Sequence, residues 1–427
     1  MFKEEKKNSQ TYQDFDDILT PYNEEEVSKI IRSHFKSGLP VELIGSGSKQ
    51  SIGNKLQCSK TLSLSKLSGI IKYLPEELYI KVKACTPIKE IEEKLKLNNQ
   101  CLAFEPIDMG HIFFGECKYG TAAGHVSTNF SGSSRFKYGS IRDHLLGFRG
   151  VNGRGEIIKS GGTVVKNVTG YDLSKLVCGS YGTLVVLTEL TFKVIPLKEN
   201  NNTLVIHNLS NEAGAEFLKN VTQTSNDITG AVHFPKTNKN ESFNINSENI
   251  FQLNDLKFGA PYSAIRLAGS KVSIQERIEN IKKELNLSNK NTSFLESYQS
   301  NLFWTKIKNL EIFSNSKNSI LRIVVPPSSI IKLIYYLERL ESQYFIDWAG
   351  HLLWAEIKNF TKENLNNLRK IITNFGGYLT IIRSGDNLDF YNEYFTINKA
   401  RYNISQKIKE SFDPKRILNP GKMYSGI

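Results

Sequence analysis

The chain has 427 residues, and its 55 lysines and arginines exceed its 43 aspartates and glutamates, giving a formal net charge of +12. Hydrophobic residues make up 39% and charged residues 23% of the sequence, which is typical of a globular protein of two or three domains with a real core. The lysines are scattered among Asn, Ser and Glu instead of forming basic runs, so nucleic-acid binding is not expected, although the charge would suit anionic partners or acidic membrane surfaces.

The cysteines and the N-terminus exclude further classes of protein. Five cysteines, an odd number, are spread along the chain without a C-x-x-C pair, so neither a disulfide framework nor an iron–sulfur or zinc site is indicated. The first residues contain no apolar signal segment, and no stretch is apolar over the roughly 18 residues that a membrane-spanning helix needs. We therefore expect reduced thiols, no metal site and a cytoplasmic chain.

The N-terminal region predicts a small α+β unit over about residues 20–98, preceded by an N-terminal tail at 1–19. Residues 24–38 have apolar residues at helical spacing and end on a glycine, which predicts a helix. A second helix is expected at 87–97, with proline in its first turn, where a missing N–H costs least. Short strands are expected at 41–44, 61–64 and 78–84.

A second unit is expected over about residues 99–197. It contains the glycine-rich stretch GTAAGHVSTNFSGSS at 120–134, and the segment VVKNVTGYDLSKLVCGSYGTL at 164–184, which has glycines on both sides of a short apolar helix. The run LVVLTELTFKVIPL at 184–197 begins like an interior strand and then alternates. Further strands are expected at 144–151 and 156–159. The polar stretch KENNNT that follows predicts a boundary between domains.

Beyond residue 203 the order of strands and helices changes. The pattern is β-α-β-β-α, then an interruption, then β-α-β-β-α-β, which predicts a mixed antiparallel sheet with helices on one face. Segments 235–261 and 288–318 are rich in Asn, Lys and Ser and are expected to hold loops or insertions. Residues 404–424 predict a helix followed by a tail with Pro and Gly. Strands are expected at 204–207, 228–234, 262–268, 321–325, 344–349, 351–357 and 378–382, and helices near 211–221, 272–286, 328–340 and 362–375.

Three loops with unusual backbone freedom are candidates for ligand binding. Gly45-Ser46-Gly47-Ser48 follows a strand but lacks the third glycine of a dinucleotide fingerprint, which leaves a plain turn or a nest of N–H groups that binds phosphate. The small residues from Gly120 would let a helix start approach an anion, and tight helix–sheet packing is the alternative explanation. With the glycines of 170–182, these loops would wrap a long, flat ligand with phosphate groups.

The sequence resembles the FAD-linked 2-hydroxyacid oxidoreductases, which have a p-cresol-methylhydroxylase-type FAD domain, and within them the FAD-binding subunits of bacterial glycolate oxidases. The resemblance depends on the segment KNVTGYDL…GSYGTL and on the ending LNPGKMY, which are specific in combination. Supporting stretches are YGSIRD at 138–143, IDWAG at 346–350 and GGY at 376–378. The resemblance extends from about residue 40 to the end of the chain and is weakest across 235–318.

The resemblance implies an α+β chain with three parts. These are a two-subdomain FAD-binding domain at 20–197, a ferredoxin-like cap or substrate domain with insertions at 198–403, and a helix and tail at 404–427 that return to the flavin. FAD is the implied cofactor, with its pyrophosphate against the first two loops and its isoalloxazine ring against the third loop and the tail. The implied cofactor-binding residues are Gly45, Ser46, Gly47, Ser48, Gly120, Thr121, Ala123, Gly124, Ser127, Lys166, Gly170, Tyr171, Asp172, Gly179, Gly182, Thr183, Asn419 and Lys422.

The sequence departs from the family in two places. Ala123 stands where the family usually has a glycine beside Gly124, and its methyl group is either accommodated or displaces the pyrophosphate. The related enzymes also have a His-x-Gly-Asp-Gly-Asn stretch and a later histidine for metal and substrate, whereas this chain has RSGDN at 383–387 and no histidine after His351. The catalytic base is therefore unknown. Arg383, which would clamp a carboxylate, and His351 are the candidates, and no metal is expected.

The implied function is that of a subunit of a glycolate oxidase complex, which oxidises glycolate or a related 2-hydroxy acid to the 2-oxo acid. The implied partners are a second flavoprotein subunit and an iron–sulfur subunit, with peripheral contact to the inner face of the membrane through the complex. Two alternatives stay open. The chain is a self-sufficient FAD-dependent D-2-hydroxyacid (D-lactate) dehydrogenase, or it is a non-catalytic structural subunit, which the missing histidines favour.

Overall fold

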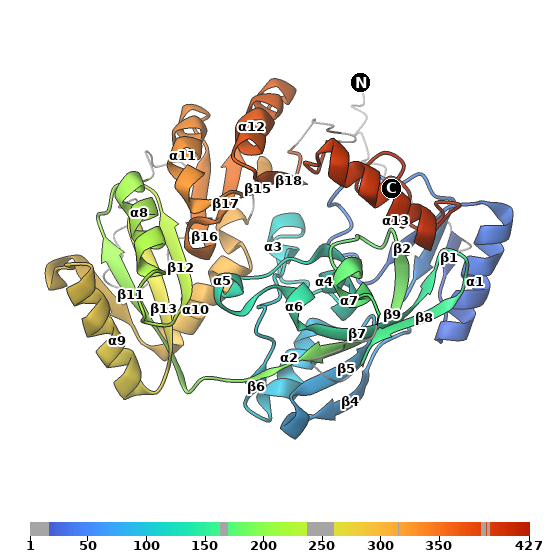
Figure 1. The fold of residues 1–427 in the computed structure, drawn as a ribbon, viewed down its shortest axis with the longest axis horizontal. Helices are drawn as coiled ribbons and strands as arrows, with labels where there is room; N and C mark the ends of the chain where they lie inside the picture. The colour runs from blue at the N-terminus through green and yellow to red at the C-terminus, as the bar shows by residue number, and fades with distance from the viewer. Residues whose placement is uncertain (1–16, 163–169, 237–259, 315, 386–389, 391–392) are drawn as a thin grey trace, which may run out of the picture.

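The computed structural model describes residues 17–162, 170–236, 260–314, 316–385, 390 and 393–427. Two halves lie side by side, with the N-terminal 200 residues on the right of Figure 1 and the following strands and helices on the left. The C-terminal helix α13 (Lys399–Phe412) crosses back from the second half to lie above the first. Segments far apart in the sequence therefore meet at the junction between the halves.

The described part of the N-terminal half contains three sheets, one of which is an antiparallel pair formed by β6 and β10. A parallel sheet of three strands has the order β1-β3-β2, and an antiparallel sheet of five strands has the order β4-β5-β9-β7-β8. The long strand β9 pairs with β5 on one side and with β7 on the other. The two subdomains predicted for this half, at about 20–98 and 99–197, therefore share one sheet. The strands are β1 (Ile18–Leu19), β2 (Val41–Ile44), β3 (Lys60–Ser63), β4 (Ile70–Leu74), β5 (Tyr79–Lys83), β6 (Gln100–Cys101), β7 (Leu145–Asn152), β8 (Ile157–Gly161), β9 (Val185–Lys193) and β10 (Ile195–Pro196).

The helices of this half follow their local sequence signals. In α1 the Asn23 side chain accepts a hydrogen bond from the Glu26 N–H at the start, and Gly38 ends the helix with a left-handed backbone. The apolar faces of α2 and α4 pack with β5, β7 and β9 in one core. The helices are α1 (Glu24–Ser37), α2 (Ile88–Lys96), α3 (Gly110–Phe113), α4 (Ala122–Thr128), α5 (Arg135–Tyr138), α6 (Ile141–His144) and α7 (Leu173–Val177).

The second half, which we call the cap, is one sheet of eight strands with the order β14-β11-β13-β12-β16-β17-β15-β18. It consists of two β-α-β-β-α-β units whose strand orders mirror each other and which join where β12 pairs with β16. Helices α8, α9, α11 and α12 cover one face with a single apolar core, and the opposite face is turned toward the N-terminal half. The predicted ferredoxin-like pattern is therefore present twice.

The bounds of the cap elements correct one prediction. Residues 288–318 were expected to hold loops or insertions, but they contain strand β14 and helix α10, because Phe303, Trp304 and Ile307 form an apolar helix face that packs on the sheet. The polar stretch at 198–203 was expected to mark a boundary between domains, and β11, the first strand of the cap, begins within it and pairs with β13. The elements are β11 (Asn200–His207), α8 (Asn211–Val221), β12 (Ile228–Phe234), β13 (Tyr262–Gly269), α9 (Lys271–Glu284), β14 (Thr292–Leu295), α10 (Ser297–Lys308), β15 (Ser319–Val324), α11 (Ile330–Arg339), β16 (Gln343–Asp347), β17 (Leu352–Ile357), α12 (Lys362–Asn374) and β18 (Tyr378–Arg383).

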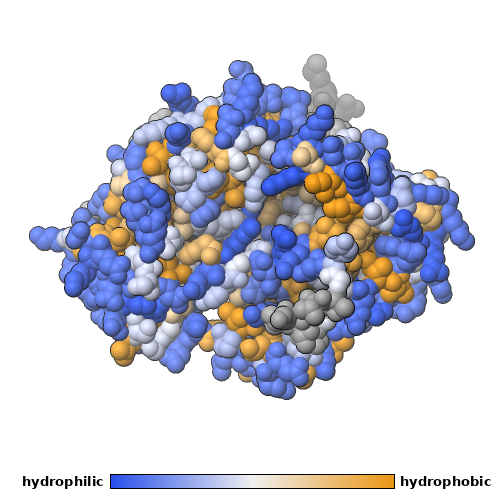
Figure 2. All heavy atoms as spheres, viewed as in Figure 1, coloured by the Kyte–Doolittle hydropathy of each residue, from blue (hydrophilic) through white to orange (hydrophobic). Residues whose placement is uncertain are grey.

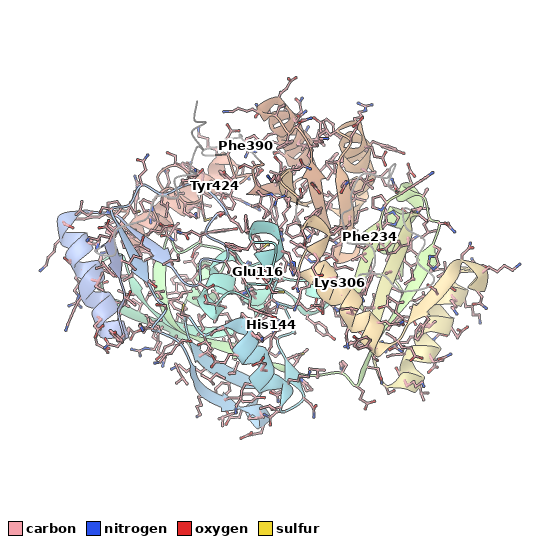
Figure 3. All side chains as sticks on the ribbon, turned by 180° about the vertical axis from the view of Figure 1, so that it is seen from behind. Glu116, His144, Phe234, Lys306, Phe390 and Tyr424 are labelled. Atoms are coloured by element: carbon pink, nitrogen blue, oxygen red, sulfur yellow. The ribbon has the colours of Figure 1, made fainter. Side chains whose placement is uncertain are left out.

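The surface is mostly polar, and apolar side chains on the face in Figure 2 form only scattered patches. The apolar material is instead buried in the junction. Figure 3 shows Phe234 among the strands of the cap and His144 in the other half, with Tyr424 of the C-terminal tail near the top. The tail, the cap strands and the segment around Phe130 contribute to one buried cluster, so the two halves pack tightly together.

Candidate functional site

A cavity opens in the N-terminal half where three segments predicted from the sequence converge. The loop after β2, the start of α4 and the turn before β9 all line it, together with the C-terminal tail. The sequence-predicted residues in its lining are Gly45, Ser46, Gly47, Ser48, Thr121, Ala123, Gly124, Ser127, Gly182, Asn419 and Lys422. Residues separated by almost the whole chain thus form the wall of one binding site.

Glycine is required at two places in this wall. A Cβ at Gly45 would lie 2.8 Å from Thr121 Oγ1, so the loop after β2 approaches α4 closely only without a side chain. Gly182 has φ +73°, a left-handed conformation, and a Cβ there would lie 2.8 Å from Asn419 Nδ2. Both glycines expose main-chain atoms at the surface of the cavity. A ligand that is bound by backbone groups requires such exposed main chain.

The loop after β2 offers backbone donors to a ligand. Within the described residues, the N–H groups of Ser46, Gly47 and Ser48 donate no hydrogen bond, and Gly47 has φ +73°. Consecutive N–H groups in such a turn form a concave site for an anion. The start of α4 differs, because the N–H groups of Ala122 and Ala123 donate to Thr86 and Ala84 at 3.0 and 2.8 Å. The helix start therefore shapes the cavity, and the loop after β2 supplies the free donors.

The structure adds Lys49, which the sequence analysis did not select. Its ammonium lies 3.5 Å from Ser48 Oγ and 3.3 Å from His125 Nε2, and a Cβ at Gly120 would lie only 2.6 Å from it. Burial lowers the pKa of Lys49 to about 8, although the Asp108 carboxylate partly opposes this. Burial, with help from the Lys49 charge, also lowers the pKa of His125 well below its usual value, so this ring is neutral. A cation in a wall of N–H groups is suited to a phosphate.

The C-terminal tail is held against the cavity by buried polar contacts. Asn419 Nδ2 donates to Tyr181 O at 2.9 Å, while Asn419 Oδ1 accepts from Leu43 N at 2.7 Å. Lys422 Nζ donates to Gln50 O at 2.7 Å and to Asn54 O at 3.2 Å. These two predicted residues therefore join the loop after β2 to the turn before β9, and contact the cavity themselves.

A fully buried ion pair between Lys409 and Asp413 holds the turn that precedes β9. Lys409 Nζ on α13 donates to Asp413 Oδ2, Thr183 O and Leu418 O at 2.8, 2.6 and 2.9 Å. Thr183 is thus buried and holds the turn through its carbonyl, outside the cavity lining.

The other predicted residues of the third loop do not line this cavity. Tyr171 is 92% exposed, and Asp172 caps α7 and pairs with Lys175. Gly120 lies next to the cavity beneath Lys49, whereas Gly170 and Gly179 are not in its lining. Lys166 lies outside the described residues. Tyr181, which was not predicted, does line the cavity, and its ring packs against Phe395 of the cap side at 5.0 Å.

The two candidate catalytic residues have structural contacts. Arg383 donates from Nε to Asn318 O at 3.0 Å and from Nη1 to Ile112 O at 2.8 Å, which ties the cap to α3. His351 is exposed, and its Nδ1 lies 3.0 Å from Trp348 O. Trp348 and Trp354 are buried at the junction. Instead, the face of the cap sheet that is turned toward the N-terminal half presents Arg322, which is 4% exposed and belongs to β15.

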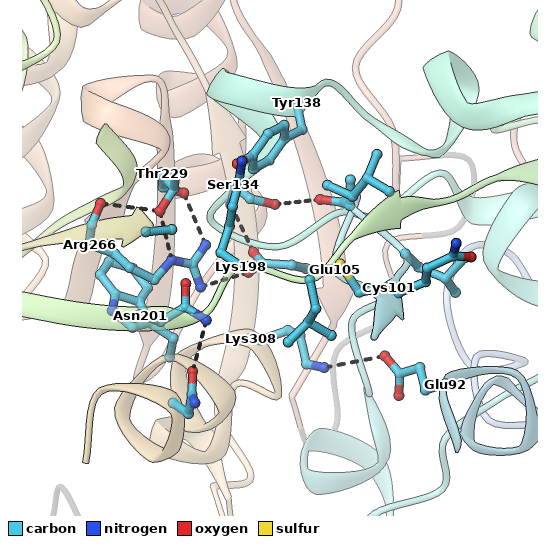
Figure 4. A pocket seen from close by; sticks show the side chains of 18 of the residues that line it. Glu92, Cys101, Glu105, Ser134, Tyr138, Lys198, Asn201, Thr229, Arg266 and Lys308 are labelled. Carbon is cyan, nitrogen blue, oxygen red and sulfur yellow. Dashed lines mark hydrogen bonds and ion pairs between the residues drawn. The ribbon is translucent and has the colours of Figure 1, made fainter. Parts of the chain in front are cut away.

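A second cavity of about 370 Å³ lies between the halves and is lined by residues of both, among them Ser134 and Arg266 (Figure 4). Arg266 of β13 crosses it to pair with Glu105 at 2.7 Å, and also donates to Thr229 Oγ1 and Thr229 O at 3.2 and 3.0 Å. Lys308 and Glu92 face each other at 3.9 Å at its edge. Because its charged groups largely satisfy one another, this cavity serves as a polar interface between the halves.

Comparisons with known proteins agree with this geometry. Residues 16–161 match the model of an FAD binding domain. The chain is 29% identical to the glycolate oxidase subunit GlcE of Escherichia coli K12, over 91% of this chain and 93% of that one. It is 25% identical to a D-lactate dehydrogenase of Anaerostipes hadrus, over 93% of this chain and 87% of that one. The chain is an FAD-dependent oxidoreductase.

Solved structures show the same fold. The structure of p-cresol methylhydroxylase with substrate bound covers 96% of the chain, and the chain covers 88% of it, with a TM-score of 0.70 and 14% identity. The α+β architecture with a p-cresol-methylhydroxylase-type FAD domain, predicted from the sequence, is confirmed, as is FAD as the cofactor. The glycine-lined wall, its free N–H groups and the Lys49 ammonium fit a cofactor with a pyrophosphate.

Two features are absent from the described residues. No helix there is long and apolar enough to cross a membrane. No group of three or more His, Cys, Asp and Glu residues in the same part of the chain is arranged to hold a metal ion.

Proposed function

We propose that the chain is the FAD-binding subunit of a glycolate oxidase-type complex, and that it oxidises glycolate or a close 2-hydroxy acid such as D-lactate to the 2-oxo acid. The observation that carries this is the convergence of the glycine loops and the tail at one cavity, in a chain that is similar to a glycolate oxidase subunit over 91% of its length. Bound FAD would accept a hydride equivalent from the α-carbon of the substrate.

The residues have distinct proposed roles toward FAD. The N–H groups of Ser46, Gly47 and Ser48, with the Lys49 ammonium, would bind the pyrophosphate, since within the described residues the three N–H groups have no acceptor and the ammonium contacts only the neutral Ser48 and His125 side chains. The turn at Gly182, held by Asn419, would offer main chain to a ring edge of the cofactor. We also propose that the FAD-binding domain is residues 20–197, and that the cap at 198–403 covers the flavin and holds the substrate.

The relative's description as a subunit supports a multisubunit assembly. We propose a second flavoprotein subunit and an iron–sulfur subunit as partners, with peripheral contact to the membrane through the complex. All five cysteines of this chain are unpaired by disulfides and lack the clustered spacing of an iron–sulfur site, so clusters would belong to a separate chain.

Similarity to a D-lactate dehydrogenase supports a second candidate, a self-sufficient enzyme. The test is an absorbance spectrum of the purified full chain, followed by anaerobic addition of glycolate and, separately, D-lactate. Bleaching of the flavin band would place both cofactor and dehydrogenation on this chain, and turnover with an artificial acceptor would favour the self-sufficient enzyme. A flavin that stays oxidised with both acids would overturn catalysis by this chain and leave a structural subunit.

A matched pair of glycine variants tests the cavity itself. Gly45→Ala places a methyl group 2.8 Å from Thr121 Oγ1, so its narrowed cavity should retain much less FAD. Gly162→Ala is the control, because within the described residues no atom lies within 4 Å of the added Cβ. Equal FAD content in both variants would contradict the assignment of this cavity.

A further inference from the structure

Arg322 lies on the face of the cap sheet that is turned toward the N-terminal half. Its neighbours along β15, Leu321 and Ile323, belong to the core beneath the cap helices, so alternation along the strand directs Arg322 to the opposite face. On that face it lies between Trp354 of β17 and Thr380 of β18, its partners in the two adjacent strands. A charged residue thus occupies the middle of a sheet face that is otherwise largely apolar.

The described surroundings of Arg322 are aromatic and provide no ion-pair partner. The guanidinium carbon lies 4.9, 6.0 and 5.4 Å from the ring centres of Trp348, Trp354 and Phe130. Within the described residues Arg322 forms no ion pair, and its buried Nε has no hydrogen-bond partner. Cation–π contacts recover only part of the free energy that burying a guanidinium costs.

A second guanidinium adds to the positive charge. Arg135 of α5 lies 4.3 Å from the centre of the same Trp348 ring, and it likewise makes no ion pair in the described part of the chain. Burial lowers the pKa of Arg322 and the nearby Arg135 lowers it further, whereas the Tyr378 hydroxyl raises it. Two neighbouring cations without an acidic partner make a site that an anion would stabilise.

Tyr181 connects this site to the FAD cavity. It lines the cavity, its main chain is held by Asn419, and its phenol is close enough to Arg322 for their charges to interact. The other side of the Tyr181 ring packs on Phe395 at 5.0 Å. The Arg322 guanidinium therefore lies at the junction between the cap and the wall of the cavity.

We propose that Arg322 binds the carboxylate of the substrate, with Arg135 as a supporting cation, an assignment that rests on the proposed oxidation of a 2-hydroxy acid. A planar guanidinium forms two parallel charge-assisted hydrogen bonds with a carboxylate, which holds the acid in one orientation. The site would select a small carboxylate over a neutral alcohol, because only an anion compensates the buried charge. Arg322 would thus act in place of Arg383, whose guanidinium is bound to two main-chain carbonyls.

The experiment measures ligand affinity in the full chain loaded with FAD, from the perturbation of the flavin spectrum. Oxalate, which is not oxidised at an α-carbon, glycolate and uncharged glycolamide are the probes. Arg322→Met should weaken oxalate and glycolate binding by roughly ten- to a hundredfold, as expected for loss of a hydrogen bond to a charged group, and leave glycolamide unchanged. Arg322→Lys keeps the positive charge but not the paired donors of the guanidinium, so its affinity for oxalate and glycolate should fall less. Arg339→Met, at an exposed position on α11, is the control and should bind all three probes as the unaltered chain does.

The outcomes separate this inference from the proposed function. If Arg322→Met retains FAD and binds oxalate as tightly as the unaltered chain, the inference is overturned, even if glycolate still bleaches the flavin. If the unaltered chain binds oxalate no better than glycolamide binds, the inference is also overturned. If oxalate binding depends on Arg322 but neither glycolate nor D-lactate reduces the flavin, the inference stands and the proposed function fails. Should Arg322→Met lose FAD, Arg322→Lys decides between these outcomes.

Discussion

Arg266 and Arg322 are two arginines on the same face of one sheet, each in a different half of the cap. Arg266 is 8% exposed, lies 4.8 Å from the Trp304 ring centre and pairs with Glu105 of the N-terminal half. Arg322 is 4% exposed, lies among Trp348, Trp354 and Phe130, and has no carboxylate partner in the described residues. Both arginines contact tryptophan rings, but within the described residues only Arg266 has a counter-ion.

The difference separates a structural cation from one reserved for a ligand. The Nε, Nη1 and Nη2 atoms of Arg266 each have a partner within the chain, which is Thr229 or Glu105. The pair with Glu105 joins the halves. Although burial opposes it, Arg266 holds the pKa of Glu105 below its usual value, which keeps the carboxylate ionised. Burying a charge without an ion-pair partner costs free energy. We infer that the fold retains such a charge where a bound anion offsets this cost.

The largest effect is expected from breaking the paired arginine. Arg266→Met should lower the free energy of unfolding by about 3–5 kcal/mol, because it leaves the Glu105 carboxylate buried without its partner. Chemical denaturation followed by tryptophan fluorescence measures this. The double variant Arg266→Met with Glu105→Gln should recover part of the loss, since no unpaired charge remains. A single variant as stable as the unaltered chain would show that the pair does not join the halves.

The next effect concerns Asp347, which interacts electrostatically with both members of the pair and accepts hydrogen bonds from Trp348 N and Ser133 Oγ at 2.6 and 2.9 Å. Burial raises its pKa to about 7. The native carboxyl therefore holds a proton between about pH 4 and 7 that the unfolded chain has released, and its contribution to stability is lost as pH rises through this range. The total loss is roughly 2–4 kcal/mol.

Asp347→Asn should remove this pH dependence while keeping the shape of the side chain. Buried neutral histidines, such as His125 and His233, have lowered pKa values and oppose the trend, so the difference between the two proteins is the quantity to compare. The free energy of unfolding of both proteins should be measured at pH 5 and at pH 8. The difference between the two proteins should change by roughly 2–4 kcal/mol from the lower to the higher pH. A constant difference would mean that Asp347 titrates normally.

Lys49 extends the comparison to the cofactor, because like Arg322 it forms no ion pair within the described ranges. At pH 7, Lys49→Met should weaken FAD binding by roughly ten- to a hundredfold, as a charge-assisted contact to phosphate is lost. Since the pKa of Lys49 is about 8, FAD affinity of the unaltered chain should fall as pH rises above 8, by up to roughly tenfold per pH unit. Fluorescence titration with FAD should find no such fall in Lys49→Met.

The sequence predicted more of the fold than of the site. Most strands and helices were found from apolar periodicity, because α1 and β9, for example, have clear patterns and end signals. Helix α10 was missed, since its Asn, Lys and Ser content hid the few apolar residues that pack on the sheet. Composition indicates exposure on average, whereas three well-placed side chains are enough to bury a helix.

In the site, the glycine loops were predicted from their backbone freedom, whereas Asn419 and Lys422 were implied by the family resemblance; the structure places Gly45, Gly182 and both tail residues in the lining of one cavity. Lys49 and Arg322 were not predicted, because a lysine or arginine without an acidic partner looks in sequence like any other. What distinguishes them within the described residues is burial without an ion-pair partner, which only the packing of distant segments creates. Tyr171 shows the reverse, since its motif is distinctive while its side chain points into solvent.

The smallest expected effect sharpens the comparison most. Arg322→Met should change the free energy of unfolding by no more than about 1 kcal/mol in the absence of ligands, and in the stabilising direction, because it replaces an unpaired buried charge by an apolar side chain that suits Trp348 and Trp354. The same change at Arg266 destabilises, so the sign of the effect, measured by identical denaturation experiments, distinguishes the two residues. Added oxalate should stabilise the unaltered chain and leave Arg322→Met unaffected, since only the former gains a bound anion. If both arginines prove equally destabilising to remove, Arg322 is part of the framework, and its missing partner is not a carboxylate from the substrate.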